Sequence, residues 1–151
     1  MTGAEEMQDL LELIVEALGI DGTVVMEDDG ETVTGTIEGE SLGLLIGHHG
    51  STIDAIQHLA ARVVLRDGPE SDRRRVVVDA DGYRARRREA LEAQAEGAAD
   101  DAVRTEAAVA LPAMSPAERR IVHEFLRDRA DVDTHSEGEG AERRLVVSPA
   151  E

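Results

Sequence analysis

The segment Gly47-His48-His49-Gly50 constrains the fold of this chain more than any other. A short apolar run precedes it, and an apolar pattern with helical spacing over residues 51–66 begins directly after it. Glycine allows the backbone to turn tightly and to come close to a ligand. A helix start presents free N–H groups and a partial positive charge. This order therefore predicts two helices joined by a tight turn that faces an anion such as phosphate.

A Gly-x-x-Gly turn between two helices is typical of a KH domain, in which it clamps the backbone of about four single-stranded nucleotides. The four residues alone favour an ordinary tight helix–helix turn, because chance matches to Gly-x-x-Gly are frequent. Their setting favours nucleic acid, because Ser51 and Thr52 are expected to cap the following helix and an alternating strand-like stretch lies upstream at 33–37. We therefore interpret residues 47–50 as a nucleic-acid contact.

The net charge of −17 is unfavourable for binding a polyanion, but its distribution is uneven. Residues 1–47 hold 12 acidic side chains and no Arg or Lys, whereas residues 62–88 hold nine Arg against five acidic side chains. The basic segment begins at the end of the helix that follows the Gly-x-x-Gly turn. This is where an RNA-binding surface needs positive charge, and Arg62 is therefore an expected contact.

The hydrophobic periodicity predicts a mixed α+β chain of 151 residues, long enough for two small domains. The order α-β-β-α-α-β is expected over the ranges 5–18, 23–27, 32–38, 42–46, 51–66 and 75–79, with a hairpin turn at 28–30 and a break at Gly68-Pro69. A long helix is expected over 83–103, with Leu91 and Gln94 in one stripe. The sequence leaves open whether it is a connector, an oligomer surface or the start of a second domain. A short strand within 105–112 and strands at 132–136 and 143–148 are expected after it.

A second group of functional residue types lies on a helix expected to start after Ser115. Ser115 as N-cap, Pro116 at the first helical position and Glu118 three residues after the cap predict a capping box. At about 100° per residue, an arc opposite the apolar face carries Arg119, Arg120, His123 and Arg127. Such an arc suits phosphate binding, but a solvated helix face has a similar appearance, and composition does not separate the two.

The sequence argues against an enzyme, a cofactor or a metal site, because the motifs that these functions use are incomplete or missing. The segment 123–127 (HEFLR) lacks the second His of the zinc-protease pattern, and a chain without Lys has no phosphate-binding loop of the Walker type. The spacing of Gly43, Gly47 and Gly50 does not fit a dinucleotide fingerprint. Without cysteine, the chain forms no disulfide and no Cys-based zinc site.

Two segments together, GHHGSTIDAIQHL and MSPAERRIVHEFL followed by VDTHSEGEGAERRLVV, resemble the bacterial Jag family of SpoIIIJ-associated proteins, also called KhpB or EloR. The resemblance covers nearly all of the chain. It implies an α+β fold with a type II KH domain (α-β-β-α-α-β) over 1–80. A long helix and a small α+β R-three-H domain over 81–151 follow, named for an Arg-x-x-x-His pair that is Arg119 and His123 here.

The resemblance further implies binding of single-stranded RNA. The absence of Cys and of a long apolar run, together with the missing catalytic motifs, leads us to expect a cytoplasmic, non-enzymatic protein without membrane insertion. Its implied role is that of a regulator or RNA chaperone linked to cell elongation and division, with a small single-KH-domain protein as partner. A protein-interaction adaptor is the alternative, which forms a homo- or heterodimer through the KH fold and the acidic segment 1–47. The expected RNA-binding residues are Gly47, His48, His49, Gly50, Ser51, Arg62, Arg119, Arg120, His123 and Arg127.

Three departures from the family pattern stand out. An additional N-terminal domain of many members has no counterpart in these residues, so roles that depend on it are not expected. Both inner positions of the turn, His48 and His49, are histidine where a basic residue is common. Ala117 occupies a position that is often aromatic, and it removes a platform on which a base would stack.

Overall fold

The computed structural model describes residues 1–66 and 74–151, and the chain divides into two compact units, Met1–Arg84 and Ala85–Glu151. Each unit has a hydrophobic core of its own. The predicted break at Gly68-Pro69 lies outside the described residues. Within the described ranges, no helix has the length and apolar character needed to cross a bilayer.

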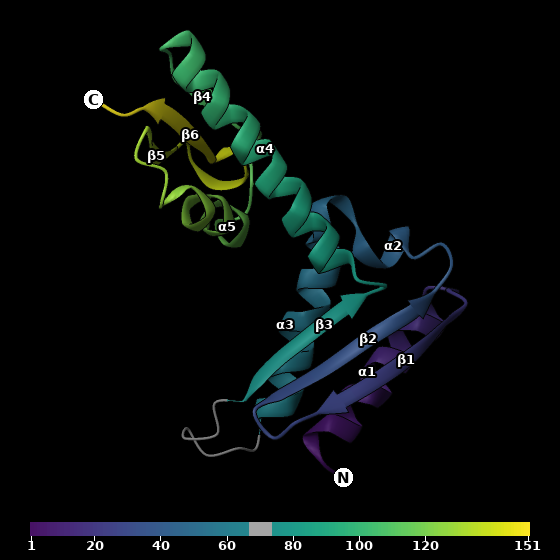
Figure 1. Cartoon of the computed structure of the whole chain (residues 1–151). Helices are drawn as coiled ribbons and strands as arrows, with labels where there is room; N and C mark the ends of the chain where they lie inside the picture. Colours follow the sequence, from purple (N-terminus) through teal and green to yellow (C-terminus); the bar gives the residue numbers. More distant parts are fainter. Residues whose placement is uncertain (67–73) are drawn as a thin grey trace. The chain divides into compact units, whose positions relative to one another are not determined.

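The first unit has the predicted order α-β-β-α-α-β (Figure 1). In its sheet, β2 lies between β1 and β3, and it pairs antiparallel with β1 and parallel with β3. This arrangement confirms the type II KH fold. The elements are α1 (Gly3–Ala17), β1 (Gly22–Asp28), β2 (Thr32–Gly39), α2 (Gly43–Ile46), a 3-10 turn η1 (His48–Gly50), α3 (Ser51–Leu65) and β3 (Arg75–Ala80).

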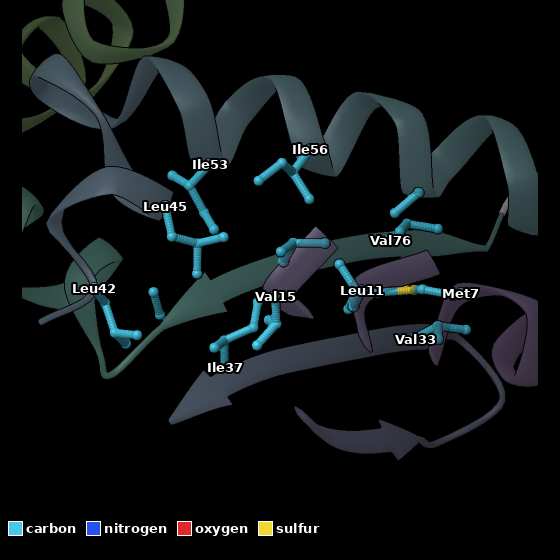
Figure 2. Packing of buried hydrophobic residues seen from close by; sticks show 13 residues of the cluster. Met7, Leu11, Val15, Val33, Ile37, Leu42, Leu45, Ile53, Ile56 and Val76 are labelled. Carbon is cyan, nitrogen blue, oxygen red and sulfur yellow. The ribbon is translucent and has the colours of Figure 1, made fainter. Parts of the chain in front are cut away.

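Helices α1 and α3 pack on one face of this sheet and bury an aliphatic core between them (Figure 2). Met7 and Leu11 of α1 lie one helical turn apart, and Ile53 and Ile56 of α3 have the same periodicity. Gly35 of β2 lets α1 pack closely on the sheet, because a Cβ atom there would lie 2.5 Å from the Leu11 Cδ1 atom and displace that side chain. The close contact of α1 and α3 with the sheet fixes the start of α3, and with it the Gly-x-x-Gly turn.

The second unit contains the rest of the chain in a three-stranded antiparallel sheet with two helices. In the sheet, β6 lies between β4 and β5. The predicted strand within 105–112 is reduced to two residues. The elements are α4 (Tyr83–Thr105), which begins at the end of the first unit, β4 (Val109–Ala110), α5 (Pro116–Leu126), β5 (Val132–Glu137), a 3-10 turn η2 (Gly140–Glu142) and β6 (Arg144–Pro149).

The buried face of α4 settles the role that the sequence left open. Leu91 and Ala95 are fully buried, and with three further alanines of α4 they belong to the core of the second unit. The helix therefore opens this unit. The predicted stripe through Gln94 is wrong at that position, because Gln94 is exposed and Ala95, four residues after Leu91, faces the core.

Candidate nucleic-acid interface

The backbone of the turn depends on glycine at position 47. Gly47 has φ 73° and ψ −173°, a combination that is nearly confined to glycine. A Cβ atom at this position would also lie 2.2 Å from the Thr52 Oγ1 atom and 2.9 Å from the Thr52 backbone nitrogen. Both the dihedral angles and the contact with α3 therefore exclude a side chain here.

His49 and Gly50, the last two residues of the turn, have left-handed backbone. Gly50 is buried with φ 81°, and a Cβ atom there would lie 2.8 Å from the Tyr83 Cε1 atom. His49 has φ 53° and ψ 29°, a conformation in which His, Asn and Asp are enriched among non-glycine residues. The side chains of His48 and His49 are exposed, and their rings stack with centroids 3.9 Å apart.

Helix α3 starts without a side-chain cap. Its N-cap is Gly50, and Ser51 and Thr52 lie inside the first turn of the helix, so the prediction that they cap it is wrong. Ser51 is nonetheless exposed beside the two histidines. Because no side-chain oxygen caps this helix end, its positive dipole end is open to an external anion.

The second candidate site begins at the first turn of α5. The Ser115 Oγ atom accepts a hydrogen bond from the Glu118 backbone N–H at 3.2 Å, and Pro116 occupies the first turn as predicted. The prediction that the Glu118 carboxylate bonds back to the Ser115 backbone and completes a capping box is wrong. The Glu118 carboxylate instead accepts bonds from the Arg87 Nε and Nη2 atoms at 2.7 and 3.3 Å. This ion pair ties α5 to α4, and sequence spacing gave no signal for it.

Arg119 and His123 face strand β5, and the structure brings both to one hollow. The Arg119 guanidinium donates to the Ser136 Oγ atom at 3.4 Å and to the Met114 carbonyl at 3.3 Å. The His123 Nδ1 atom lies 2.5 Å from the Thr134 Oγ1 atom. The hollow has a volume of about 380 Å³, and its other lining residues are Pro116, Arg120, His135 and Leu145. Hydroxyl, imidazole and guanidinium groups converge there, a set suited to phosphate oxygens.

Comparison with known proteins assigns both units. Residues 5–78 match the KH domain of KhpA and KhpB, and residues 89–149 match the R-three-H domain. The RNA-binding protein KhpB of Clostridium symbiosum is 35% identical over 150 residues, which cover 95% of this chain and 67% of that protein. The chain belongs to the KhpB family.

Two further KhpB proteins are similar along the chain. RNA-binding protein KhpB of Bacillus subtilis is 36% identical over 91% of this chain and 66% of its own length. The protein of the same name from Lactiplantibacillus plantarum is 33% identical over 97% of this chain and 45% of its own length. This KhpB-family chain therefore spans about two thirds of the first two relatives and less than half of the third.

The arginine arc of this KhpB-family member is less uniform than the sequence suggested. Glu124 lies at its edge and accepts a hydrogen bond from the Arg120 Nε atom at 2.9 Å, with an Arg127 nitrogen 3.8 Å away. The bond from Arg120, aided by the charge of Arg127, lowers the pKa of Glu124 below its ordinary value. Arg119 differs, because within the described ranges it has no carboxylate partner.

The opposite, apolar face of α5 is only partly buried. Val122 and Leu126 belong to the core, whereas Phe125 is 40% exposed.

Within residues 1–66 and 74–151, no group of three potential metal ligands converges.

Arg62 does not join the turn. It is exposed on α3, 11 residues after Ser51, which places it roughly 16 Å along the helix axis. There it lines a separate hollow with His58, Leu65 and Arg66. Arg62 therefore lies apart from the turn, and its role in RNA binding stays a prediction.

Proposed function

We propose that this chain binds single-stranded RNA through the turn at 47–50 and through the hollow between α5 and β5. The observation that carries the proposal is the turn itself. Position 47 requires glycine, position 50 is glycine in left-handed backbone against the Tyr83 ring, and the turn leads into a helix whose start no side chain caps. Membership of a family whose named members are RNA-binding proteins supports the same conclusion.

The two sites act on RNA in different ways. At the turn, the α3 dipole and the backbone hold a phosphate, while His48 and His49 contact its neighbours. At α5, the Arg119 fork binds a second phosphate, and His123 donates to it or stacks on a base. Ala117 offers no platform for a base, so phosphate contacts supply most of the affinity at this site.

The direct test places charge in the turn. Changing both His48 and His49 to Asp puts two negative charges where phosphate binds, while the exposed side chains and the left-handed backbone at position 49 accommodate Asp. Affinity for single-stranded RNA should fall more than tenfold with little change in melting temperature. The matched control replaces both with Asn. Unchanged RNA affinity in the Asp variant would remove the turn from the interface.

At the cellular level, we propose a cytoplasmic, non-enzymatic regulator or RNA chaperone linked to cell elongation and division. Crosslinking RNA to the protein in cells, followed by sequencing and mapping of the crosslinked residues, tests this role. Crosslinks at the turn and at α5 to defined transcripts are expected. If the protein is recovered from cells without crosslinked RNA, the result would favour an adaptor instead.

The adaptor alternative has one specific observation in its favour. Leu44 of α2 and Leu59 of α3 are 63% and 53% exposed, and both belong to the KH unit. A small single-KH-domain protein or a second copy of the chain would cover them. The molar mass of the nuclease-treated protein, measured with and without Leu59→Glu, distinguishes a leucine-dependent dimer from a monomer.

A further inference from the structure

The helix that starts at the phosphate-facing turn carries a carboxylate in its first turn. Asp54 of α3 is half exposed, and it lies at the helix end that is proposed to hold RNA phosphate. A carboxylate at this end favours the helix dipole, but it repels a bound phosphate. The site therefore contains a charge that works against its proposed ligand.

Arg84 neutralises this carboxylate. Its Nη1 atom donates to the Asp54 Oδ1 atom at 2.8 Å, and its Nε atom donates to the Val78 carbonyl of β3 at 2.9 Å. The Arg84 backbone N–H donates to the Asp79 carboxylate at 3.2 Å. The guanidinium is thus held in place between the edge of β3 and the first turn of α3.

One donor of the Arg84 side chain differs from the other two. Its Nη2 atom is buried and makes no hydrogen bond to the described residues. The hydrogen bonds of the Arg84 side chain to the described residues therefore involve its Nε and Nη1 atoms. What the position does deliver is a positive charge next to Asp54.

The neighbouring residue, Tyr83, contacts the turn directly. Its ring occupies the space where a side chain at position 50 would lie, as described above. Two adjacent residues at the start of α4 therefore act near the turn. Tyr83 packs against Gly50, and Arg84 places its positive charge next to Asp54.

We propose that Arg84 is a positioning residue of the RNA site, one that enables phosphate to bind at the 47–50 turn by neutralising Asp54 without contacting RNA. This inference rests on the proposed RNA-binding function. It makes a distinctive prediction, because the loss caused by removing Arg84 should be reversed by also removing the charge of Asp54. A direct contact with RNA that is lost with Arg84 is not restored by removing the charge of Asp54, and melting temperatures separate a reversal of binding from a reversal of stability.

The experiment uses the full chain and a fluorescein-labelled, unstructured RNA of roughly 12 nucleotides, about three times the length that one KH turn grips. Arg84→Gln should lower affinity about fivefold at about 0.05 M salt and less at about 0.5 M, because salt screens the exposed charges. Arg84→Lys, which keeps the charge, should bind within about twofold of wild type. Arg104→Gln, on the exposed Arg104–Asp101 pair, is the control for net charge.

The deciding variants are Asp54→Asn and the double change Asp54→Asn with Arg84→Gln. Asp54→Asn alone should bind as well as wild type or better, and the double variant should return to within about twofold of wild type. If Asp54→Asn alone weakens binding, or if the double variant stays as weak as Arg84→Gln, the inference is wrong. A wild-type chain that does not bind this RNA refutes the proposed function instead. Melting temperatures identify a misfolded variant, in which case Asp54→Asn still decides.

Discussion

The two candidate RNA sites present different parts of the polypeptide. The turn at 47–50 uses backbone that only glycine permits at position 47, and its side chains are two exposed histidines. The α5 site uses side chains, Arg119 and His123, which strand β5 holds through hydroxyl groups. A backbone site is sensitive to conformation, whereas a side-chain site is sensitive to charge. Substitutions should therefore have separate effects at the two sites.

The acidic residues of the two sites differ in how far they are buried. Asp54 and Glu118 each lie in the first turn of a helix that carries a site, and each pairs with an arginine of α4. The Asp54 side chain is 50% exposed and that of Glu118 only 11%. Solvent screens the first pair, so it adds little to stability, and the effect proposed for it is on the repulsion between Asp54 and a bound phosphate. The second pair is largely buried, and its main effect is on stability.

The largest expected effect comes from the backbone site. Gly47→Ala should cost about 3 kcal/mol, because the dihedral angles are nearly exclusive to glycine and the new Cβ atom overlaps Thr52. RNA binding should be lost with the turn. Thermal unfolding and RNA affinity are the measurements. Gly43→Ala is the matched control, because a Cβ atom at position 43 meets nothing within 4 Å. Equal behaviour of the two variants would show that the turn is not conformationally constrained.

The second prediction concerns the buried pair. Glu118→Gln should destabilise the chain by about 2 kcal/mol, because it removes the negative charge from the group that two Arg87 nitrogens contact in a poorly solvated position. Chemical denaturation measures the loss. Arg88→Ala, which removes an exposed pair with Glu92 at 3.9 Å, is the control and should change stability by less than about 0.5 kcal/mol. Equal losses in the two variants would contradict the difference in burial.

The outcome at Glu118 also shows how far the sequence can predict this site. Ser115 and Pro116 act as their local spacing predicted, since a helix start depends on residues close in sequence. The partner of Glu118 lies 31 residues away on α4, and a local motif carries no information about such a contact. The same holds for Gly50, whose contact with Tyr83 bridges distant parts of the chain. The order of the elements followed from periodicity, but the long-range polar contacts did not.

The third prediction separates two neighbouring arginines. Arg119→Ala should reduce the dependence of log affinity on log salt by roughly 0.7, the value for one lost phosphate contact on a single strand. Arg120→Ala should reduce it by less, because Arg120 is already paired with Glu124. RNA titrations at several salt concentrations measure both slopes. If neither single variant nor their combination changes the slope, this face of α5 is only a solvated surface.

The smallest expected effect distinguishes the histidines of the turn from permanently charged residues. Histidine is the side chain that ordinarily changes charge between pH 5 and 8, and a bound phosphate favours its protonated form. RNA affinity should therefore rise about two- to fivefold from about pH 7.5 to about pH 6 if side-chain charge at the turn contributes to binding. The stacked rings limit the gain, since two adjacent positive charges repel each other.

His123 of α5 faces the second site and contributes to any such profile, so the control must isolate the turn. The double change His48→Asn and His49→Asn removes both imidazoles, and Asn suits the left-handed backbone at position 49. RNA affinity measured at constant ionic strength across this pH range is the test. If the Asn variant reproduces the wild-type profile, or if both profiles are flat, the histidines serve the turn through its backbone conformation alone. In that case the backbone site binds phosphate without help from side-chain charge, and the contrast with the α5 site becomes complete.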